Sequence, residues 1–263
     1  MNPTDTRPPA REREFGYAFV DVVGTDVTGL TIALSKSLKV EGRVSFDAPS
    51  PPASKGLRMR VHAGVLGPAL LQMSGRPQSA AVDEKLRFEL TEIQRGLPLV
   101  IEMSGLPEGW LLRSVRVGER DITAVPTDFG SVPEPPRLEL VVTNRVARPS
   151  VRVVDDEGRP VTDYGLSVLP ADPTRWNGSM RHDLNQPTRD GTLKLDAIVP
   201  GDYLLAALST DEYNLLVFDP ARFTDSRRKR IDDLVAASTR VTFVEGDDRT
   251  INLRMTAQRP RQQ

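Results

Sequence analysis

Residues 27–34 read VTGLTIAL, residues 136–142 read PRLELVV and residues 249–255 read RTINLRM. In each stretch apolar side chains alternate with other residues, as in a β-strand that buries one face. A new block of short alternating segments follows each of the first two stretches, so the sequence predicts tandem β-modules. No complete block precedes the first stretch. We therefore expect it to be the end of a preceding module that is truncated here.

The composition suits small β-modules with many turns. The chain has 263 residues, of which 38% are hydrophobic, together with 22 prolines and 19 glycines. This length leaves room for two domains of ordinary size. Proline and glycine at this frequency are typical of short strands joined by tight turns.

Charge and cysteine content exclude several classes of function. The 35 Lys and Arg residues balance 36 Asp and Glu residues, which gives no basic surplus for nucleic acid or an anionic membrane. Without cysteine there is no disulfide, thiol nucleophile or thiolate metal site. No stretch approaches the roughly 20 apolar residues that span a bilayer.

The N-terminus is polar, rich in proline and lacks the apolar segment of a secretory signal. Together with the orphan strand, this favours an extracellular, surface or periplasmic protein whose signal lies upstream of this chain; a cytoplasmic location stays an alternative. The patterning predicts the following order: a disordered leader at 1–14, terminal strands of the truncated module at 15–36, a first sandwich at 37–144, a second at 147–256 and a disordered tail at 257–263.

Segments of the two predicted modules can be aligned at a fixed offset in residue number. Phe88–Ile93 aligns with Leu193–Ile198 at an offset of 105, because 193 − 88 = 105, and Gly96 aligns with Gly201 at the same offset. Strand patterning is also plain within the modules: Leu57, Met59, Val61 and Ala63 alternate with Arg58, Arg60 and His62.

One segment departs from the β pattern. Asp219 followed by Pro220 is a typical helix start. The apolar residues after it fall within one arc at helical spacing: Phe223, Ile231, Leu234 and Val235. We predict a helix over residues 220–237, packed on one face of the second sandwich.

Three stretches carry a resemblance to a known family. Residues 155–161 read DDEGRPV, residues 190–195 read DGTLKL and residues 199–206 read VPGDYLLA. Together they resemble the carboxypeptidase regulatory-like domain family, which has a transthyretin-like sandwich of about seven strands. The resemblance covers most of 151–255 and, more weakly, 40–142, where RGLP at 95–98 replaces the Pro-Gly-x-Tyr turn. It implies an all-β fold of two tandem Greek-key β-sandwiches with one inserted helix, and it carries no catalytic residue.

The two histidines give weak candidates for chemistry. His62 lies among arginines without a cluster of partners, which favours the polar side of a strand over a ligand or catalytic role. His182 has Asp183 and Ser179 nearby in sequence. A Ser-His-Asp triad depends on spatial geometry that proximity in sequence does not supply, so a solvated loop is the simpler interpretation.

Charged clusters also have simpler interpretations. Asp155-Asp156-Glu157 and Asp247-Asp248 fit ordinary turns better than calcium sites, which need six or more oxygens. The basic tract at 227–230 fits the solvated face of the predicted helix, with ion pairs from Arg228 to Asp232 and from Lys229 to Asp233. We predict no catalytic, cofactor-binding or metal site, and no cofactor.

Trp176 is the one candidate ligand contact, since a tryptophan ring in a loop can stack on a sugar. Packing onto the sandwich is the alternative, and packing is also expected for Trp110.

We therefore expect a non-enzymatic structural or interaction module of a larger exported or surface protein, with a spacer, adhesion or assembly role. The alternatives are a carbohydrate-binding module and an accessory domain of a peptidase. Expected partners are adjacent modules of the same polypeptide, and further candidates are a glycan or another surface protein. Nucleic acid and a bilayer are not expected.

Overall fold

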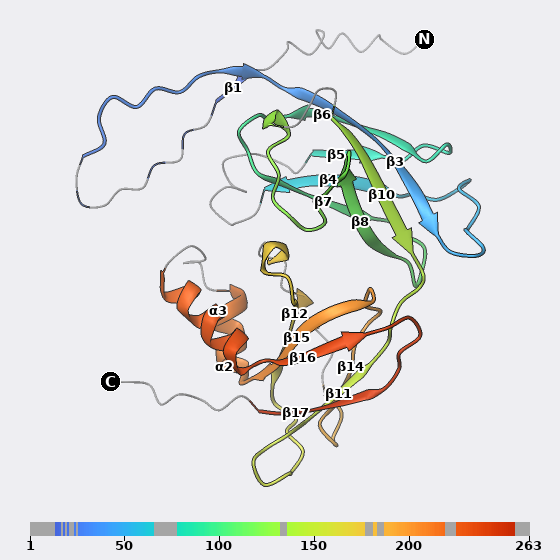
Figure 1. Cartoon of the computed structure of the whole chain (residues 1–263), viewed down its shortest axis with the longest axis vertical. Helices are drawn as coiled ribbons and strands as arrows, with labels where there is room; N and C mark the ends of the chain where they lie inside the picture. Colours follow the sequence, from blue (N-terminus) through green and yellow to red (C-terminus); the bar gives the residue numbers. More distant parts are fainter. Residues whose placement is uncertain are drawn as a thin grey trace, which may run out of the picture. The chain divides into compact units, whose positions relative to one another are not determined.

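The chain is all-β, with two helices in its second half (Figure 1). The computed structural model describes residues 14–16, 18, 20, 24, 26–65, 78–131, 136–176, 181–182, 187–218 and 225–255. Two compact units form: the first comprises residues 1–45, 53–105 and 114–140, and the second 46–52, 106–113 and 141–263. Of the predicted first module, 37–144, residues 46–52, 106–113 and 141–144 are assigned to the second unit.

Two sheets belong to the first half of the chain. The larger has the order β6-β3-β10-β8-β9, and its strands are β6 (Arg87–Ile93), β3 (Leu38–Asp47), β10 (Arg137–Thr143), β8 (Leu111–Val117) and β9 (Arg120–Asp121). The smaller has the order β5-β4-β7, with β5 (Gln78–Ala81), β4 (Arg60–Val65) and β7 (Leu99–Ser104).

Alternation along these strands places apolar residues in the core, as predicted. Val40, Leu90 and Leu140 are buried in the larger sheet, and Val61 and Ala63 in the smaller. The polar residues between Val61 and its apolar neighbours, Arg60 and His62, are less buried. A short 3-10 turn, η1 (Phe129–Ser131), adds the fully buried ring of Phe129.

The second unit pairs a three-stranded sheet with a four-stranded one. The first has the order β14-β11-β17 and contains β14 (Thr192–Lys194), β11 (Ser150–Val154) and β17 (Thr250–Arg254). The second has the order β13-β12-β15-β16 and contains β13 (Arg181–His182), β12 (Gly165–Pro170), β15 (Gly201–Leu208) and β16 (Thr239–Phe243). Val151 and Leu253 of one sheet and Leu166, Leu205 and Phe243 of the other share one core cluster.

The repeat predicted from sequence is visible in the strand orders. β6, β3 and β10 are neighbours in one sheet, and β14, β11 and β17 are neighbours in another. The aligned segment Phe88–Ile93 lies within β6 and the segment Leu193–Ile198 begins within β14. These two strands occupy the same place in the two arrangements.

The helical segment is longer than predicted. Helix α3 (Asp225–Ala237) matches the predicted helix over 220–237, while Asp219, Pro220 and Phe223 lie outside the described residues. A preceding helix, α2 (Thr210–Phe218), was not predicted. Leu234 of α3 is buried against Leu169, Ala206 and Leu208, with Ile231 and Tyr213 packed alongside, so both helices cover the outer face of β12 and β15 (Figure 1).

The predicted strand over residues 27–34 is wrong. The structure pairs only β1 (Glu14–Phe15) with β2 (Ser35–Lys36), and residues 26–34 belong to no strand. Of residues 15–22, which belong to the terminal strands predicted at 15–36, half lie outside the described residues. Apolar alternation at Leu30, Ile32 and Leu34 therefore exists without the sheet that would bury it.

Candidate functional site

The second unit carries an apolar hollow of about 260 Å³. Its lining residues are all assigned to this unit: Leu111, Leu112, Val168, Pro170, Ile198, Val199 and Tyr203. β12 supplies Val168 and Pro170, and β15 supplies Tyr203. The turn before β15 holds the Tyr203 ring beside the hollow.

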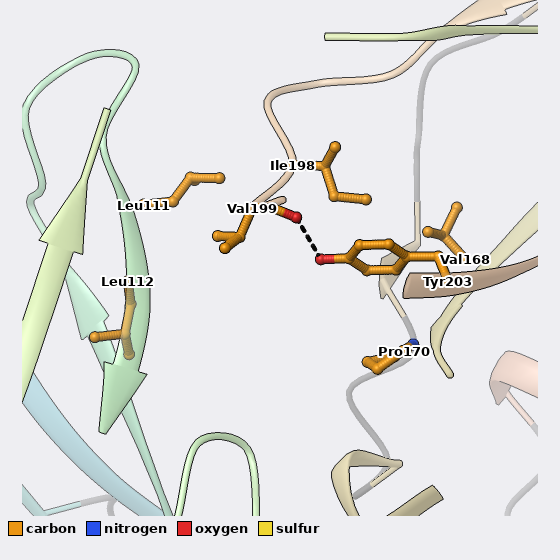
Figure 2. A pocket seen from close by; sticks show the side chains of 7 residues that line it. All are labelled: Leu111, Leu112, Val168, Pro170, Ile198, Val199 and Tyr203. Atoms are coloured by element: carbon orange, nitrogen blue, oxygen red, sulfur yellow. Dashed lines mark hydrogen bonds between the residues drawn. The ribbon is translucent and has the colours of Figure 1, made fainter. Parts of the chain in front are cut away.

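Tyr203 is the polar group of this hollow, and its hydroxyl is engaged. The hydroxyl donates a hydrogen bond of 2.8 Å to the Val199 carbonyl (Figure 2). The ring also lies 5.8 Å from that of Phe243, tilted by 45°. Because the other lining side chains are aliphatic, the hollow offers an apolar surface and no acid-base pair.

Trp176 follows a short turn built by Asp172. The Asp172 carboxylate accepts hydrogen bonds from the Thr174 hydroxyl (2.7 Å) and amide (3.0 Å), which caps η2 (Pro173–Arg175). These bonds, the hydroxyl first, lower the pKa of Asp172 below its usual value. The turn directs the chain back toward β12.

The Trp176 indole packs under the helices. Its Nε1 donates a 2.6 Å hydrogen bond to the Pro170 carbonyl, and its ring contacts the cluster that includes Leu169 and Leu234. The ring is half-buried. A role of Trp176 as a ligand contact stays a prediction, because a packed ring with one open side is compatible with either use.

The two histidines lie in different units. His62 Nε2 is 2.6 Å from the Ser104 hydroxyl across the β4–β7 ladder. His182 lies in β13, where it pairs with Ser167 of β12. Ser179 and Asp183, the other members of the considered triad, lie outside the described residues.

The acidic cluster after β11 closes a turn. Asp155 accepts hydrogen bonds from the amides of Glu157 (3.0 Å) and Arg159 (2.8 Å), and the Arg159 Nε binds its other oxygen at 2.8 Å. The Arg159 amide is the main reason why the pKa of Asp155 is lowered. In the second cluster, Arg249 Nε lies 3.2 Å from the largely buried Asp247 carboxylate.

No group of three or more potential metal-binding side chains is found in the described parts of the chain. The basic tract lies on α3, where Lys229 is exposed; the side chains of Arg227, Arg228 and Arg230 lie outside the described set. Of the helices described, none is long and apolar enough to cross a membrane.

Sequence reasoning missed an ionic network around Asp47. Arg113 binds one of its carboxylate oxygens and Arg145 lies 3.7 Å from the other. The Thr143 hydroxyl donates to the Asp47 carbonyl at 3.1 Å. Near this network, Trp110 meets Phe46 edge to face at 5.0 Å, which confirms packing as its role. All of these residues are assigned to the second unit.

No family model matches this sequence, and no match to a curated protein is found. Solved structures match at low identity. The TIE protein of Bacillus anthracis is 11% identical with a TM-score of 0.27, and the match covers 86% of this chain and 35% of that one. This chain therefore spans about a third of the length of that protein.

Two pilins match at similar levels. A streptococcal ancillary pilin is 12% identical with a TM-score of 0.32, over 92% of this chain and 70% of that one. GBS52, a minor pilin of Streptococcus agalactiae, is 11% identical with a TM-score of 0.32, over 86% and 98% of the two chains. Matches at these TM-scores assign neither a family nor an activity to this chain.

Proposed function

We propose that this chain is a non-enzymatic structural or interaction part of a larger exported or cell-surface bacterial protein. In this proposal its two β units are spacers, adhesion units or assembly units. The observation that carries the proposal is the repeated three-strand arrangement, β6-β3-β10 and β14-β11-β17. Repetition of one module along a chain extends its reach and multiplies its surfaces without adding chemistry.

The resemblance to the carboxypeptidase regulatory-like family is part of this proposal. The stretch at 155–161 forms the turn between β11 and β12, and the stretch at 190–195 contains β14. Gly191 has a φ of +75°, and a Cβ there would lie 2.7 Å from the Val153 carbonyl oxygen. A glycine at this corner is thus required by a close approach of backbones, which supports the resemblance as a structural one.

The hydrogen bonds made by the polar side chains described above support a non-enzymatic role. Asp155 and Asp172 cap turns, and Tyr203 bonds to its own backbone turn. Such contacts stabilise the sandwich and leave these groups engaged. A peptidase accessory role would need a catalytic domain elsewhere in the parent protein, and a carbohydrate-binding role would need an open face of Trp176.

Surface exposure in the source cell tests the proposal. Intact cells are treated with an external protease and probed with an antibody raised against the purified chain. We expect loss of the signal while a cytoplasmic marker protein persists. Survival of the signal until the cells are lysed would overturn the proposal. Secretion of a substrate-converting activity that purifies with this chain would do the same.

A further inference from the structure

The sheet β14-β11-β17 of the second unit has a cationic outward face (Figure 1). Val151, Leu193 and Leu253 lie in the sandwich core, so the residues between them along each strand point outward. The outward positions are Ser150, Arg152, Val154, Thr192, Lys194, Thr250, Asn252 and Arg254. Three of these residues are cationic and none is acidic. Each is exposed or half-buried, so the face is open to solvent.

The internal repeat supplies a matched face for comparison. Glu41 lies opposite Glu89 in the β3–β6 ladder, and Ser150 lies opposite Lys194 in the β11–β14 ladder. These pairs correspond at offsets of 109 and 105 in residue number, so the two ladders have the same register. The third strand aligns at an offset of 113, which places PRLELVV at 136–142 over RTINLRM at 249–255.

The face of the first sheet has a balanced charge. Its positions equivalent to those above hold three cations and three glutamates: Glu41, Arg43, Ser45, Arg87, Glu89, Arg137, Glu139 and Val141. The two signs meet across strands, because Lys39 pairs with Glu89 at 3.3 Å and Arg43 pairs with Glu139 at 2.6 Å. In the second sheet all three glutamates are replaced by a neutral or cationic residue, so the formal charge of the face changes from 0 to +3.

Arg152 shows the consequence of this replacement. It aligns with Arg43 at the offset of 109, but its neighbour across the β11–β17 ladder is Asn252, where the first sheet has Glu139. Opposite charges at facing positions stabilise a sheet, and the second sheet does without them. Its arginine is instead anchored by a 3.3 Å hydrogen bond from Nε to the Asp190 carbonyl. Both NH₂ groups of Arg152 are left without a partner among the described residues.

The three cations form a diagonal stripe across the sheet. Lys194 is opposite Ser150, Arg152 is two residues further along β11, and Arg254 is opposite Val154. Successive members are one strand and two residues apart, which places their Cα atoms about 8 Å from one another. The face therefore presents cationic side chains at regular intervals along one line.

Carboxylates at the margin of the face are engaged in their own turns. Asp190 accepts hydrogen bonds from the Thr188 hydroxyl and from the Thr192 amide at 3.3 Å. Asp155 accepts from the Arg159 amide and Nε, each at 2.8 Å. Neither of these two carboxylates forms an ion pair with Arg152 or Arg254 in the described part of the chain.

The spacing of the stripe fits an extended acidic peptide. In an extended chain alternate side chains point to one side and are about 7 Å apart, so their carboxylates can reach cations spaced about 8 Å apart. Arginine binds carboxylates with charge-assisted and often bidentate hydrogen bonds. The face has no aromatic ring on which a nucleic-acid base could stack. Its one apolar side chain, Val154, is half-buried, which leaves nothing to insert into a bilayer.

We propose that the outward face of β14-β11-β17 docks an extended acidic segment of another protein, whose alternate carboxylates bind Arg254, Arg152 and Lys194. This rests on the proposed function and deepens its interaction role by naming the chemistry of the partner. Exposed ion pairs are individually weak and screened by salt, so a single contact is weak. Several copies displayed together on a surface would strengthen it through avidity.

Fluorescence anisotropy of a labelled synthetic peptide with the repeat Glu-Thr-Glu-Thr-Glu tests this docking on the purified full chain. We expect binding that weakens as the ionic strength rises from about 0.01 M to about 0.15 M, because the Debye length falls from about 30 Å to about 8 Å. The neutral peptide Gln-Thr-Gln-Thr-Gln should not bind. A peptide with the same charge but adjacent glutamates, Glu-Glu-Glu-Thr-Thr, should bind more weakly than the alternating one.

Asn252→Glu is the decisive variant because it restores the glutamate of the first sheet. It should pair with Arg152 as Glu139 pairs with Arg43, keep the circular dichroism spectrum and weaken peptide binding at least about fivefold. Thr239→Glu places the same charge at an exposed position of β16 in the other sheet and is the matched control. Arg254→Gln, at an exposed end of β17, gives a second variant that should also weaken binding.

Three outcomes would overturn the proposal. One is no binding of the alternating peptide by the folded natural chain at low ionic strength. Another is an equal effect of Asn252→Glu and Thr239→Glu. The third is tighter binding of polygalacturonate or of a single-stranded oligothymidylate than of the peptide, which would assign the face to a polysaccharide or a nucleic acid. A chain that is exposed on cells but fails these tests would contradict this inference alone and leave the proposed function standing.

Discussion

The ring of Phe88 lies against the backbone of Gly42, its direct partner across the β3–β6 ladder. A Cβ at Gly42 would overlap the Phe88 ring and lie 2.9 Å from the Leu138 carbonyl oxygen. Phe88 is only 6% exposed, so its ring fills the space that a side chain at position 42 would take. Glycine is therefore required here by the close approach of an aromatic neighbour.

Gly42→Ala should destabilise the first unit by about 1–3 kcal/mol, the usual range for overpacking a filled core site. Urea unfolding followed by circular dichroism measures the change. Gly64→Ala is the control, because among the described residues no heavy atom beyond its chain neighbours lies within 4 Å of its Cβ position. It should change stability by less than about 1 kcal/mol, with a gain expected from reduced flexibility of the unfolded chain.

Adding Phe88→Leu to Gly42→Ala should recover part of the loss. Equal stability of Gly42→Ala and the natural chain would contradict the packing argument.

A buried hydroxyl on β12 offers a test in the opposite direction. The Ser167 side chain is 2% exposed and finds no hydrogen-bond partner within the described part of the chain. An unsatisfied buried hydroxyl costs about 1–3 kcal/mol, so Ser167→Ala should leave the free energy of unfolding unchanged or raise it by about 1 kcal/mol.

Thr143→Val is the matched comparison for Ser167→Ala. The Thr143 hydroxyl is fully buried, donates to the Asp47 carbonyl at 3.1 Å and accepts from the Arg145 amide at 3.0 Å. Its loss should lower the free energy of unfolding by about 1–2 kcal/mol. Both variants are measured by thermal and urea unfolding. A loss at Ser167 as large as that at Thr143 would mean that Ser167 does have a partner.

Acidic pH should weaken the β15–β16 pair through Asp202. The Thr242 hydroxyl (2.6 Å) and then the Arg240 guanidinium (2.9 Å) donate to its carboxylate, and they lower the pKa of Asp202 below its usual value. A lowered folded pKa gives stability that is present above the unfolded pKa of about 3.9 and is lost as the pH falls through the folded pKa.

The measurement is the urea midpoint at pH 6 and at pH 3. Asp202→Asn should lower the midpoint at pH 6 and reduce its fall between the two pH values. Asp196→Asn serves as the control, since Asp196 is exposed and makes no side-chain hydrogen bond to another described residue. It should leave the fall unchanged. If Asp202→Asn leaves the fall unchanged too, the Asp202 contacts do not contribute to acid sensitivity.

Period-two patterning predicted most strands because it reports which face of a segment is buried. The alternation at Leu57, Met59, Val61 and Ala63 predicted a strand, and β4 begins within it at Arg60. Residues 30–34 have the same alternation and form none, because a strand also needs a neighbouring ladder, which the pattern does not encode. The apolar side chains at Leu30, Ile32 and Leu34 accordingly stay exposed among the described residues.

Other features were beyond sequence reasoning for a related reason. Helix α2 ends in LLVF, a continuous apolar run that cannot be distinguished from a strand by periodicity. Asp47 meets Arg113 and Arg145 only after the chain has folded, so no local spacing in the sequence predicts that network. Turn caps such as Asp155 were predicted correctly as turn residues because their hydrogen bonds are local.

Substitutions of Trp176 can distinguish a packing role from a ligand-binding role. Trp176→Phe removes the Nε1 bond to the Pro170 carbonyl but keeps an aromatic ring against the helix-covered cluster, so it should cost about 1 kcal/mol of stability. Trp176→Ala also removes the ring and should cost about 3 kcal/mol.

A glycan array with the natural chain and Trp176→Phe then tests recognition. Because phenylalanine still stacks on sugars, glycan binding that Trp176→Phe retains and Trp176→Ala loses would support the carbohydrate-binding alternative. No binding by the folded natural chain, together with the graded stability loss, would assign Trp176 to packing.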